Sequence, residues 1–269
     1  MAVVYNTGET AEELKAKYNP EGSILRQAQL RMLDMLLYLD QICKTINVDY
    51  MLSDGNVLGA VRHQGFVPWD DDVDVYIERK DWKRLIAYLK KNPHHQYVIQ
   101  DHETDPYYYG SWAILRDLKS EYIIDSDIHN IRKYKGLQVD IFPIEKDNIM
   151  FFQKVARAFT WWNNSKNAKS RPQIANYIYL FQFHVLYPAF RVITTLFSRN
   201  RYYMHCYGAY WIDKIPIDVC FPHKPLLFEG HMLNGPSKPD DYLRILFGNY
   251  MDLPPLDERC QHQAHYKIW

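Results

Sequence analysis

The residues most able to do chemistry are four aspartates that fall within five positions, Asp70, Asp71, Asp72 and Asp74. Apolar residues alternate with the last of them in VDVYI, which predicts a strand over residues 73–77. Because side chains of a strand alternate between its faces, Asp72 and Asp74 should project from the same face. Two carboxylates that close repel each other unless a cation lies between them, and oxygen-only ligands suit Mg²⁺ or Mn²⁺. The spacing therefore predicts a metal site for phosphoryl or nucleotidyl transfer.

A third carboxylate lies in a later apolar segment. Asp140 is the one acid within residues 137–142, LQVDIF, which should form a short strand ended by Pro143. Such an acid is costly to bury without a partner, so a structural salt bridge is the simplest explanation. If this strand lies beside the one that carries Asp72 and Asp74, Asp140 becomes a metal ligand or a general base for an attacking hydroxyl.

A solvated loop, a calcium site and a zinc site are less favoured. A solvated loop would not follow the apolar GFVPW and precede a strand pattern. A helix–loop–helix calcium site needs glycine at its sixth position, where this chain has Val75. A zinc site would have to draw on an irregularly spaced set, namely Cys260, His262 and His265 with Cys220 or His223.

The elements that must position the acids follow from periodicity. Apolar residues at three- and four-residue steps predict a helix over 23–46, capped by Ser23, and an amphipathic helix over 80–91. Further strands are expected at 49–53, 97–100 and 112–116. A glycine-containing turn at 55–59 should follow the first of these strands, just ahead of the aspartates.

Charge divides the chain into unlike portions. Lys plus Arg and Asp plus Glu each number 32, so the net charge predicts no polyanionic partner such as nucleic acid. Residues 148–212, however, contain eight basic residues and no acid. We therefore predict a catalytic core over 1–147, a basic, aromatic-rich helical subdomain over 148–212, and a C-terminal segment over 213–269 that packs back on the core.

Location is indicated by the N-terminus, the cysteines and one apolar stretch. The start of the chain lacks the pattern of a secretory signal, and the four cysteines include no CxxC pair, which together favour the cytoplasm. Residues 174–197 are long enough to span a bilayer, but Gln182, His184, Pro188 and Arg191 interrupt them. We expect a helical subdomain with buried aromatic side chains; peripheral contact with an anionic membrane is the alternative, and a true span is the least favoured interpretation.

A family resemblance adds to these patterns. The run YMLSDGNVLGAVRHQGFVPWDDDVDVYIERKDW, residues 50–82, closely resembles the core of the LicD family, and VDIFPIE and FGNYMDLPPLDER look like later elements of it. The resemblance extends over about residues 25–265 and is weakest in the middle. LicD proteins belong to the nucleotidyltransferase superfold. The resemblance therefore implies an α+β fold, a nucleotidyltransferase-like core with a mixed β-sheet flanked by helices.

The resemblance also implies residue roles. Asp72 and Asp74 match paired metal ligands and Asp140 the third catalytic carboxylate, so Mg²⁺ or Mn²⁺ is the expected cofactor. A glycine-turn element that presents backbone N–H groups to phosphates corresponds to Ser53, Gly55, Asn56 and Gly59. Its side chains differ from the commoner Gly-Thr version, so the backbone role is the one expected of Asn56. The remaining expected substrate-binding residues are Arg62, His63, Asp70 and Arg116.

LicD-like proteins are associated with attaching phosphocholine, taken from CDP-choline, to sugars of bacterial teichoic acids or lipopolysaccharide. The resemblance implies in-line attack by a sugar hydroxyl of a glycan acceptor, free or lipid-linked, on the choline-bearing phosphorus, with CMP leaving. A lipid-linked acceptor would place the protein at the inner membrane face. The alternatives are transfer of another CDP-linked polyol phosphate, nucleotidyl transfer, and a non-catalytic choline- or glycan-binding module.

Aromatic residues, 15% of the chain, gain a second role if choline is bound. An aromatic face attracts a quaternary ammonium by about 0.5–2 kcal/mol. Two clusters offer such faces: Tyr107, Tyr108, Tyr109 and Trp112, and Tyr202, Tyr203, Tyr210 and Trp211. Core packing remains the simpler role for any single ring, so the sequence assigns no cage.

Overall fold

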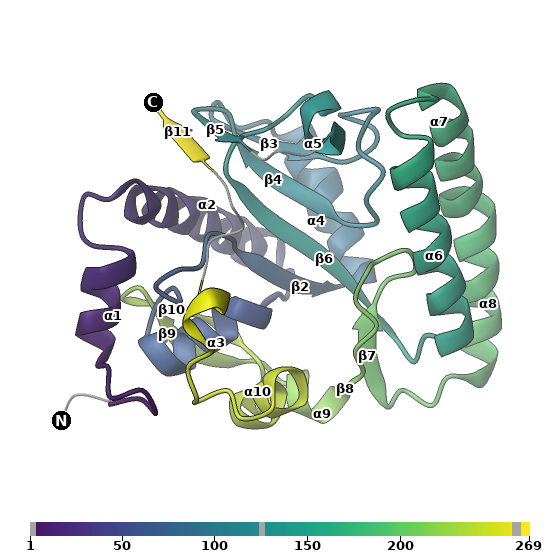
Figure 1. The fold of residues 1–269 in the computed structure, drawn as a ribbon. Helices are drawn as coiled ribbons and strands as arrows, with labels where there is room; N and C mark the ends of the chain where they lie inside the picture. The colour runs from purple at the N-terminus through teal and green to yellow at the C-terminus, as the bar shows by residue number, and fades with distance from the viewer. Residues whose placement is uncertain (1–3, 124–126, 260–264) are drawn as a thin grey trace.

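The computed structural model describes residues 4–123, 127–259 and 265–269. Within them, a mixed sheet crosses the middle of the molecule in the order β1–β2–β6–β4–β3, with β7 paired to β6 and β8 to β7 (Figure 1). Its strands are β1 (Met51–Leu52), β2 (Asp74–Glu78), β3 (Tyr97–Gln100), β4 (Ala113–Asp117), β6 (Gln138–Lys146), β7 (Tyr202–His205) and β8 (Ile215–Pro216).

Strand β6 organises this sheet. It pairs in parallel with β2, and antiparallel with β4 over its first residues and with β7 over its last. Residues 139–145 of β6 are all buried, as expected for a strand covered on both faces. The expected strand continues beyond Phe142 because Pro143 fits within it: Pro143 is opposite Ile77 of β2, and its carbonyl accepts a hydrogen bond of 3.1 Å from the N–H of Cys206. The expectation that Pro143 ends the strand is therefore wrong.

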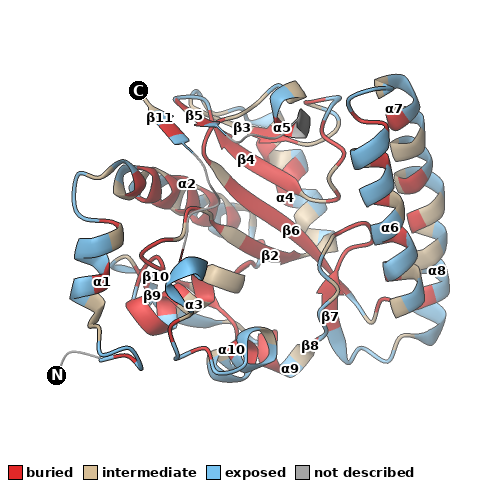
Figure 2. Cartoon of the chain, in the orientation of Figure 1, coloured by how far each residue is buried: buried red, intermediate tan, exposed pale blue. Residues whose placement is uncertain are grey.

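Long amphipathic helices cover the sheet. In α2 (Ile24–Ile46), the Ser23 hydroxyl accepts a bond of 3.2 Å from the N–H of Arg26, which confirms the expected cap. Its buried face joins α4 (Arg79–Lys91) and the sheet in the main hydrophobic core (Figure 2). These features confirm a mixed sheet flanked by helices in an α+β fold.

The segment expected as a turn at 55–59 is helical. Helix α3 (Asp54–His63) begins directly after β1 and buries Val57 and Ala60 in the core. A glycine inside a helix lowers helix stability by up to about 1 kcal/mol relative to alanine. Burial of the apolar side chains of α3 outweighs this cost here. Gly59 is needed for space, because a Cβ there would lie 2.3 Å from the carbonyl oxygen of Gly65.

Three helical segments lie together at one end of the sheet: α6 (Met150–Lys166), α7 (Pro172–Phe181) and α8 (Tyr187–Phe197), with a π-helical turn, η1 (Gln182–Leu186), between the last two (Figure 1). Strand β7, from the same basic stretch, belongs to the main sheet. The division into 1–147, 148–212 and 213–269 stays a prediction. Some aromatic side chains of this end, such as Tyr187, are buried as expected, but many are exposed.

The remaining elements surround α3 and the sheet edges. The β9–β10 hairpin contacts α3 and β1, and α10 also packs on α3, while β11 pairs with β5. Their bounds are α1 (Ala11–Tyr18), β5 (Ser120–Ile123), α5 (Asp127–Ile131), α9 (Ile217–Cys220), β9 (Lys224–Phe228), β10 (His231–Gly235), α10 (Pro239–Phe247), η2 (Leu256–Glu258) and β11 (His265–Ile268).

Candidate active site

A pocket of about 680 Å³ lies where α3, β2 and the segment after α10 meet. Its lining brings together parts of the chain nearly 200 residues apart, from Asp54 to Leu253 and Pro254. Six acids line it, Asp54, Asp70, Asp72, Asp74, Asp252 and Glu258. Aromatic rings line it as well: Trp69, Phe142, Trp211, Phe247 and Tyr250. The pocket therefore combines carboxylates with aromatic walls.

The sheet brings the three predicted catalytic acids close together, although Asp140 does not itself line the pocket. Asp72 and Asp74 are half-buried, and both line the pocket. Asp74 of β2 is in register with Asp140 of the parallel strand β6, and the Asp140 N–H donates to the carbonyl of Val73 at 2.8 Å. Burial raises the pKa of Asp74 well above its ordinary value, and the nearby charges of Asp72 and Asp140 raise it further. The acids are thus close enough to repel one another.

Asp140 is held more firmly than the other two. Its Oδ1 accepts a bond of 2.6 Å from Trp112 Nε1, and its Oδ2 accepts one of 2.6 Å from Gln138 Nε2. Burial raises the pKa of Asp140 to about 6, while the nearby Arg116 and the Trp112 bond oppose that rise. A carboxyl fixed in orientation, with a pKa near neutrality, is suited to accept a proton.

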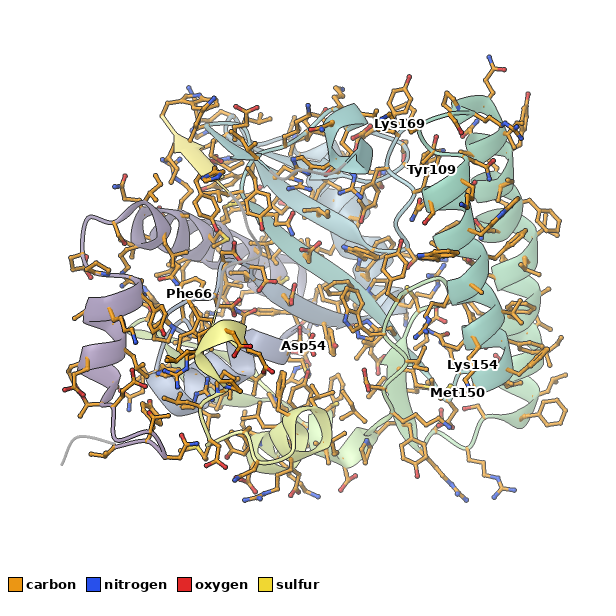
Figure 3. The ribbon with its side chains drawn as sticks, in the orientation of Figure 1. Asp54, Phe66, Tyr109, Met150, Lys154 and Lys169 are labelled. Atoms are coloured by element: carbon orange, nitrogen blue, oxygen red, sulfur yellow. The ribbon has the colours of Figure 1, made fainter. Side chains whose placement is uncertain are left out.

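Asp54 is a pocket residue that the sequence did not single out. It starts α3 with a φ of 44°, a left-handed conformation that is strained for a residue with a Cβ. The Tyr76 hydroxyl donates to its Oδ1 at 3.2 Å, and its own N–H donates to the Tyr242 hydroxyl at 3.2 Å. Burial raises its pKa to about 6. Figure 3 shows Asp54 between α3 and the central strands. The available signal was its place in SDGN, which we interpreted as a turn.

The predicted phosphate-binding residues of the α3 start divide into two groups. Gly55 lines the pocket, and a Cβ there would lie 2.7 Å from Oδ2 of Asp70. Asn56 instead holds the acidic strand: its Oδ1 accepts from the N–H of Asp74 at 2.6 Å, and its Nδ2 donates to the carbonyl of Asp72 at 3.3 Å. Ser53 and Gly59 are buried. The geometry thus gives Asn56 a positioning role for both acids.

The basic residues predicted to bind substrate mostly hydrogen-bond to other groups of the protein. Arg62 lines the pocket but is buried, donating to the carbonyls of Tyr250 at 2.8 Å and Asp252 at 3.3 Å. Its Nε donates to His63 Nε2 at 2.9 Å, and burial lowers the pKa of His63 to about 3, so this imidazole is neutral. Arg116 is buried and donates to Gln100 Oε1 and the carbonyl of Gly136. The structure does not bring Arg116 to the pocket.

Two further residues on β7 and after it were missed as site residues, although Trp211 was named among the aromatic clusters. His205 lines the pocket, and its Nε2 lies 2.8 Å from the Tyr76 hydroxyl. Burial lowers the pKa of His205 to about 3, so it is neutral. Trp211 packs its ring 5.3 Å from that of Phe142 and 5.4 Å from that of His205. Trp211, Phe142 and His205 together form an aromatic wall beside the acids. No local sequence pattern indicated that these three residues are neighbours.

The carboxylate oxygens of the pocket acids are suitable ligands for a divalent cation such as Mg²⁺. Among residues 4–123, 127–259 and 265–269, no group of three or more His, Cys, Asp or Glu side chains is placed to hold a metal ion. Mg²⁺, however, is commonly held by one or two carboxylates together with substrate phosphates and water. Asp72 and Asp74 offer such a pair at the pocket. Of the zinc set, Cys260 and His262 lie outside the described residues.

Burial of the acidic cluster, together with repulsion within it, predicts how stability depends on pH. The raised pKa values of Asp54 and Asp140, each about 6, mean that the folded state keeps protons that the unfolded state loses near its ordinary pKa of 3.8. This contribution is complete below the ordinary pKa and is lost as the pH rises through about 6. The buried neutral His63 and His205, with pKa values near 3, contribute in the opposite direction over the same interval, so the acids are isolated by comparing wild type with Asp140→Asn in EDTA. The melting temperature of the variant minus that of wild type should grow between about pH 4 and about pH 7, and Mg²⁺ should reduce this difference at the upper end. A difference that stays constant over this interval would contradict the cluster.

Comparison with known proteins agrees with the expected family. Residues 47–170 match the family model described as LicD/FKTN/FKRP, nucleotidyltransferase domain. The lipopolysaccharide cholinephosphotransferase LicD of Haemophilus influenzae is 27% identical over 261 residues, which cover 88% of this chain and 95% of that protein. An uncharacterized protein of Rickettsia prowazekii is 27% identical over 36% of this chain and 43% of its own length. The resemblance to LicD that the acidic motif indicated is confirmed.

Proposed function

Since residues 47–170 match the LicD family model, we propose that this protein is a phosphotransferase that moves phosphocholine from CDP-choline to a sugar hydroxyl. The relative's name supports a lipopolysaccharide-like glycan as the acceptor, with teichoic acid as the other bacterial candidate. The observation that carries the proposal is the register of Asp74 with Asp140, beside Asp72 at the aromatic-walled pocket. The acids that would carry the reaction belong to a nucleotidyltransferase-like core over residues 1–147, and later segments of the chain complete the pocket wall.

Each acid has a distinct task in the proposed reaction. Asp72 and Asp74 would hold Mg²⁺, which supplies charge neutralisation at the phosphates and the leaving oxygen. Asp140, fixed by Trp112 and Gln138, would accept the proton of the attacking sugar hydroxyl. The sugar oxygen then bonds to the choline-bearing phosphorus, the bond from that phosphorus to the CMP oxygen breaks, and CMP leaves. The N-terminus of α3, where Gly55 lines the pocket, would offer a phosphate the favourable end of the helix dipole.

The proposal is tested by turnover of defined donors. Purified protein is incubated with CDP-choline and a lipopolysaccharide core oligosaccharide, with Mg²⁺ or with EDTA, and CMP release and the mass of the glycan are measured. Mg²⁺-dependent CMP release with addition of one phosphocholine is the expected result. Turnover of CDP-glycerol or CDP-ribitol instead would identify another polyol phosphate, and pyrophosphate release from a nucleotide donor would identify nucleotidyl transfer. Binding without any turnover, unchanged in Asp72→Asn, would identify a binding module.

The donor's quaternary ammonium has a candidate partner in Trp211. This ring is 45% exposed, lines the pocket beside Phe142, and faces no cationic imidazole because His205 is neutral. Trp211→Ala should therefore raise the KM for CDP-choline about three- to thirtyfold, the equivalent of a cation–π contact of about 0.7–2 kcal/mol. Trp161→Ala, which removes a 56% exposed tryptophan on α6, is the matched control.

A charge-free donor separates recognition of the cation from packing. The 3,3-dimethylbutyl analogue of CDP-choline has the shape of choline without its charge. Wild type should prefer the charged donor, and Trp211→Ala should lose most of that preference. An equal loss with both donors would show that Trp211 contributes only apolar contact.

The proposal also includes a location. A lipid-linked glycan precursor would be modified in the cytoplasm at the inner face of a membrane, so peripheral membrane contact is part of the proposed function. One helix of the described chain, Pro172–Phe197, is long and apolar enough to cross a membrane by length and composition alone. Its packing against the rest of the protein supports contact with the surface of a bilayer.

A further inference from the structure

An apolar stripe runs along the outside of the helix formed by α7, η1 and α8. Its side chains recur at three-, four- and seven-residue steps, which places them on one face of a helix. They are Ile174, Tyr177, Phe181, Val185, Val192 and Leu196. All six are exposed, with Tyr177 at 72% and Leu196 at 76%. So large an apolar surface on one face is unusual for a protein that meets only water.

The opposite face of this helix is bound to the rest of the protein. The Tyr187 hydroxyl lies 2.7 Å from Thr160 Oγ1 of α6, and the Thr194 hydroxyl lies 2.5 Å from that of Tyr207. The ring of Phe190 stacks on that of Phe152 at 4.3 Å. A helix that crossed a bilayer would lose these buried contacts, so the helix lies against the protein and presents its stripe outward.

The stretch of chain that contains the stripe is basic. Residues 148–212 contain no Asp or Glu and eight basic residues, Lys154, Arg157, Lys166, Lys169, Arg171, Arg191, Arg199 and Arg201. Figure 3 shows Lys154 on α6 and Lys169 near its C-terminal end. Helix α6 adds the exposed apolar side chains Phe151, Trp161 and Trp162. Basic and aromatic residues flanking an apolar face match the headgroup region of an anionic bilayer.

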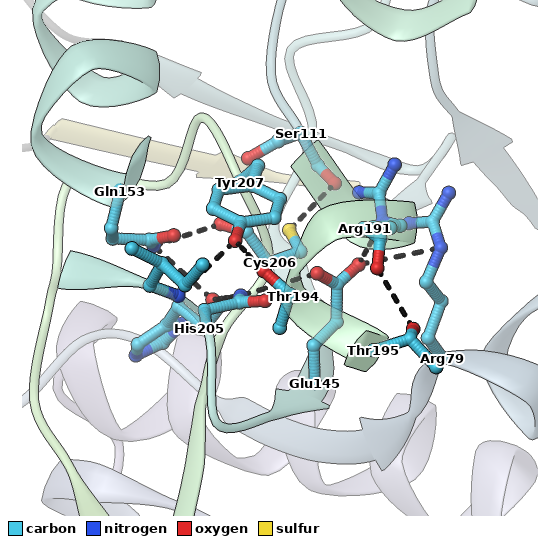
Figure 4. A network of polar contacts seen from close by, with 12 residues as sticks. Arg79, Ser111, Glu145, Gln153, Arg191, Thr194, Thr195, His205, Cys206 and Tyr207 are labelled. Atoms are coloured by element: carbon cyan, nitrogen blue, oxygen red, sulfur yellow. Dashed lines mark hydrogen bonds and ion pairs between the residues drawn. The ribbon is translucent and has the colours of Figure 1, made fainter. Parts of the chain in front are cut away.

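A basic cavity opens beside the stripe. It has a volume of about 360 Å³ and is lined by Arg79, Lys80, Lys146, Arg191 and Thr195, with Glu78 and Glu145 as its acids. One oxygen of Glu145 serves two guanidinium groups, at 2.7 Å from Nε of Arg191 and 3.3 Å from Nε of Arg79 (Figure 4). Four basic side chains against two acids leave an excess of positive charge.

The electrostatics of neighbouring groups agree with that excess. The pKa of Lys83 is lowered chiefly by the charge of Arg79. An anion in the cavity would offset this repulsion. Arg191 lies about 100° around the helix from Val192, so the cavity is at the flank of the stripe. A cavity at this flank would lie nearer the lipid phosphates than the stripe does when the stripe enters the acyl chains.

We propose that the surface formed by α6, α7, η1 and α8 docks on an anionic lipid bilayer, with the stripe among the acyl chains and a lipid phosphate in the cavity between Arg79 and Arg191. The proposal deepens the peripheral membrane contact included in the proposed function, since it names the surface and the lipid group. Docking is measured without donor or acceptor, so its outcome is independent of the proposed chemistry.

Vesicle flotation of the full chain tests the docking. Wild type should bind phosphatidylcholine vesicles that contain about 30% phosphatidylglycerol and should bind pure phosphatidylcholine much more weakly, because the anionic charge attracts the basic surface. The double variant Val192→Glu and Leu196→Glu should weaken anionic binding by about tenfold or more. Leu256→Glu, at a similarly exposed leucine far along the chain, should bind like wild type. Circular dichroism melting verifies that each variant folds.

The cavity is tested by charge reversal on one helix. Lys80→Glu changes the cavity, whereas Lys91→Glu changes the exposed far end of α4. Lys80→Glu should weaken binding to anionic vesicles about three- to tenfold, and Lys91→Glu should have little effect. If Lys80→Glu weakened only the binding of inorganic phosphate and left vesicle binding unchanged, the cavity would bind a soluble anion and the lipid assignment would be overturned.

Two further results would overturn the docking itself. One is an active wild type that does not bind anionic vesicles at low ionic strength. The other is a concentration-dependent dimer, seen by analytical ultracentrifugation, that Val192→Glu with Leu196→Glu disrupts, because a second copy would then cover the stripe. The inactive variant Asp74→Asn should still float with vesicles, which separates failure of docking from failure of the proposed chemistry.

Discussion

Asp74→Asn should lower turnover of CDP-choline by about 10³-fold or more, the kinetic equivalent of several kcal/mol of lost charge stabilisation. Asp74 combines two properties that no other acid of the pocket shares: it lines the pocket with Asp72, and it is in register with Asp140. Asparagine keeps the backbone N–H that bonds to Asn56 and keeps the side-chain size, so the strand should persist. Steady-state CMP release at saturating Mg²⁺ measures the loss.

The same substitution should stabilise the metal-free protein. The pKa of Asp74 is raised well above its ordinary value by burial and then by Asp72 and Asp140, so its ionised form is unfavourable in the fold. Removing that charge should raise the melting temperature in EDTA, by about 2–4 °C for each kcal/mol of repulsion relieved. The rise produced by Mg²⁺ in wild type should shrink in the variant.

The surface variant Asp81→Asn controls for general effects of losing a carboxylate. Asp81 pairs with Arg84 on the exposed side of α4 at 2.6 Å, away from the pocket lining. It should alter turnover less than about twofold, since exposed pairs contribute little. An Asp74→Asn protein that is inactive and also melts at a lower temperature in EDTA would contradict the repulsive cluster.

The local part of this site could be predicted from the sequence. Alternation of polar and apolar residues placed Asp72 and Asp74 on one face of a strand, and an isolated acid in an apolar segment marked Asp140. The register that joins Asp74 to Asp140 pairs strands 66 residues apart, and periodicity within one strand carries no information on its neighbour. The acids were therefore predictable and their arrangement was not.

Long-range packing explains what the sequence could not provide. The start of α3 resembles a turn because of its glycines, but burial of Val57 and Ala60 makes it helical. Arg62 has the chemistry of a phosphate ligand, yet it bonds to carbonyls 188 and 190 residues along the chain. The residue type of Arg62 indicates that it carries a positive charge and hydrogen-bond donors. Which groups it bonds to depends on where the segment after α10 packs. For the same reason Trp211 could be counted among the aromatic residues but not placed in the pocket wall.

The second large effect is expected at the proposed general base. Asp140→Asn should lower kcat about 10²–10⁴-fold and change the KM for CDP-choline little, because the loss is confined to proton transfer. The amide can still accept from Trp112 through its oxygen, and Gln138 can turn its own carbonyl toward the new NH₂ group, so the site should keep its shape. A variant with unchanged kcat would exclude Asp140 as the base.

The pH profile distinguishes a base from a structural acid. With a pKa of about 6, Asp140 must lose its proton before it can accept one, so wild-type kcat should rise with pH through that value, and Asp140→Asn should lack this limb. Trp112→Phe provides the sharper test, since it removes the hydrogen bond to Oδ1 that holds the pKa of Asp140 down. In Trp112→Phe, the rise of kcat with pH should move to higher pH, and the maximal kcat should fall less than in Asp140→Asn. A rise that stays at the same pH would show that a group other than Asp140 titrates. Asp54 is the competing group, because it lines the pocket and burial raises its pKa to about 6 as well; a limb that came from Asp54 would persist in Asp140→Asn.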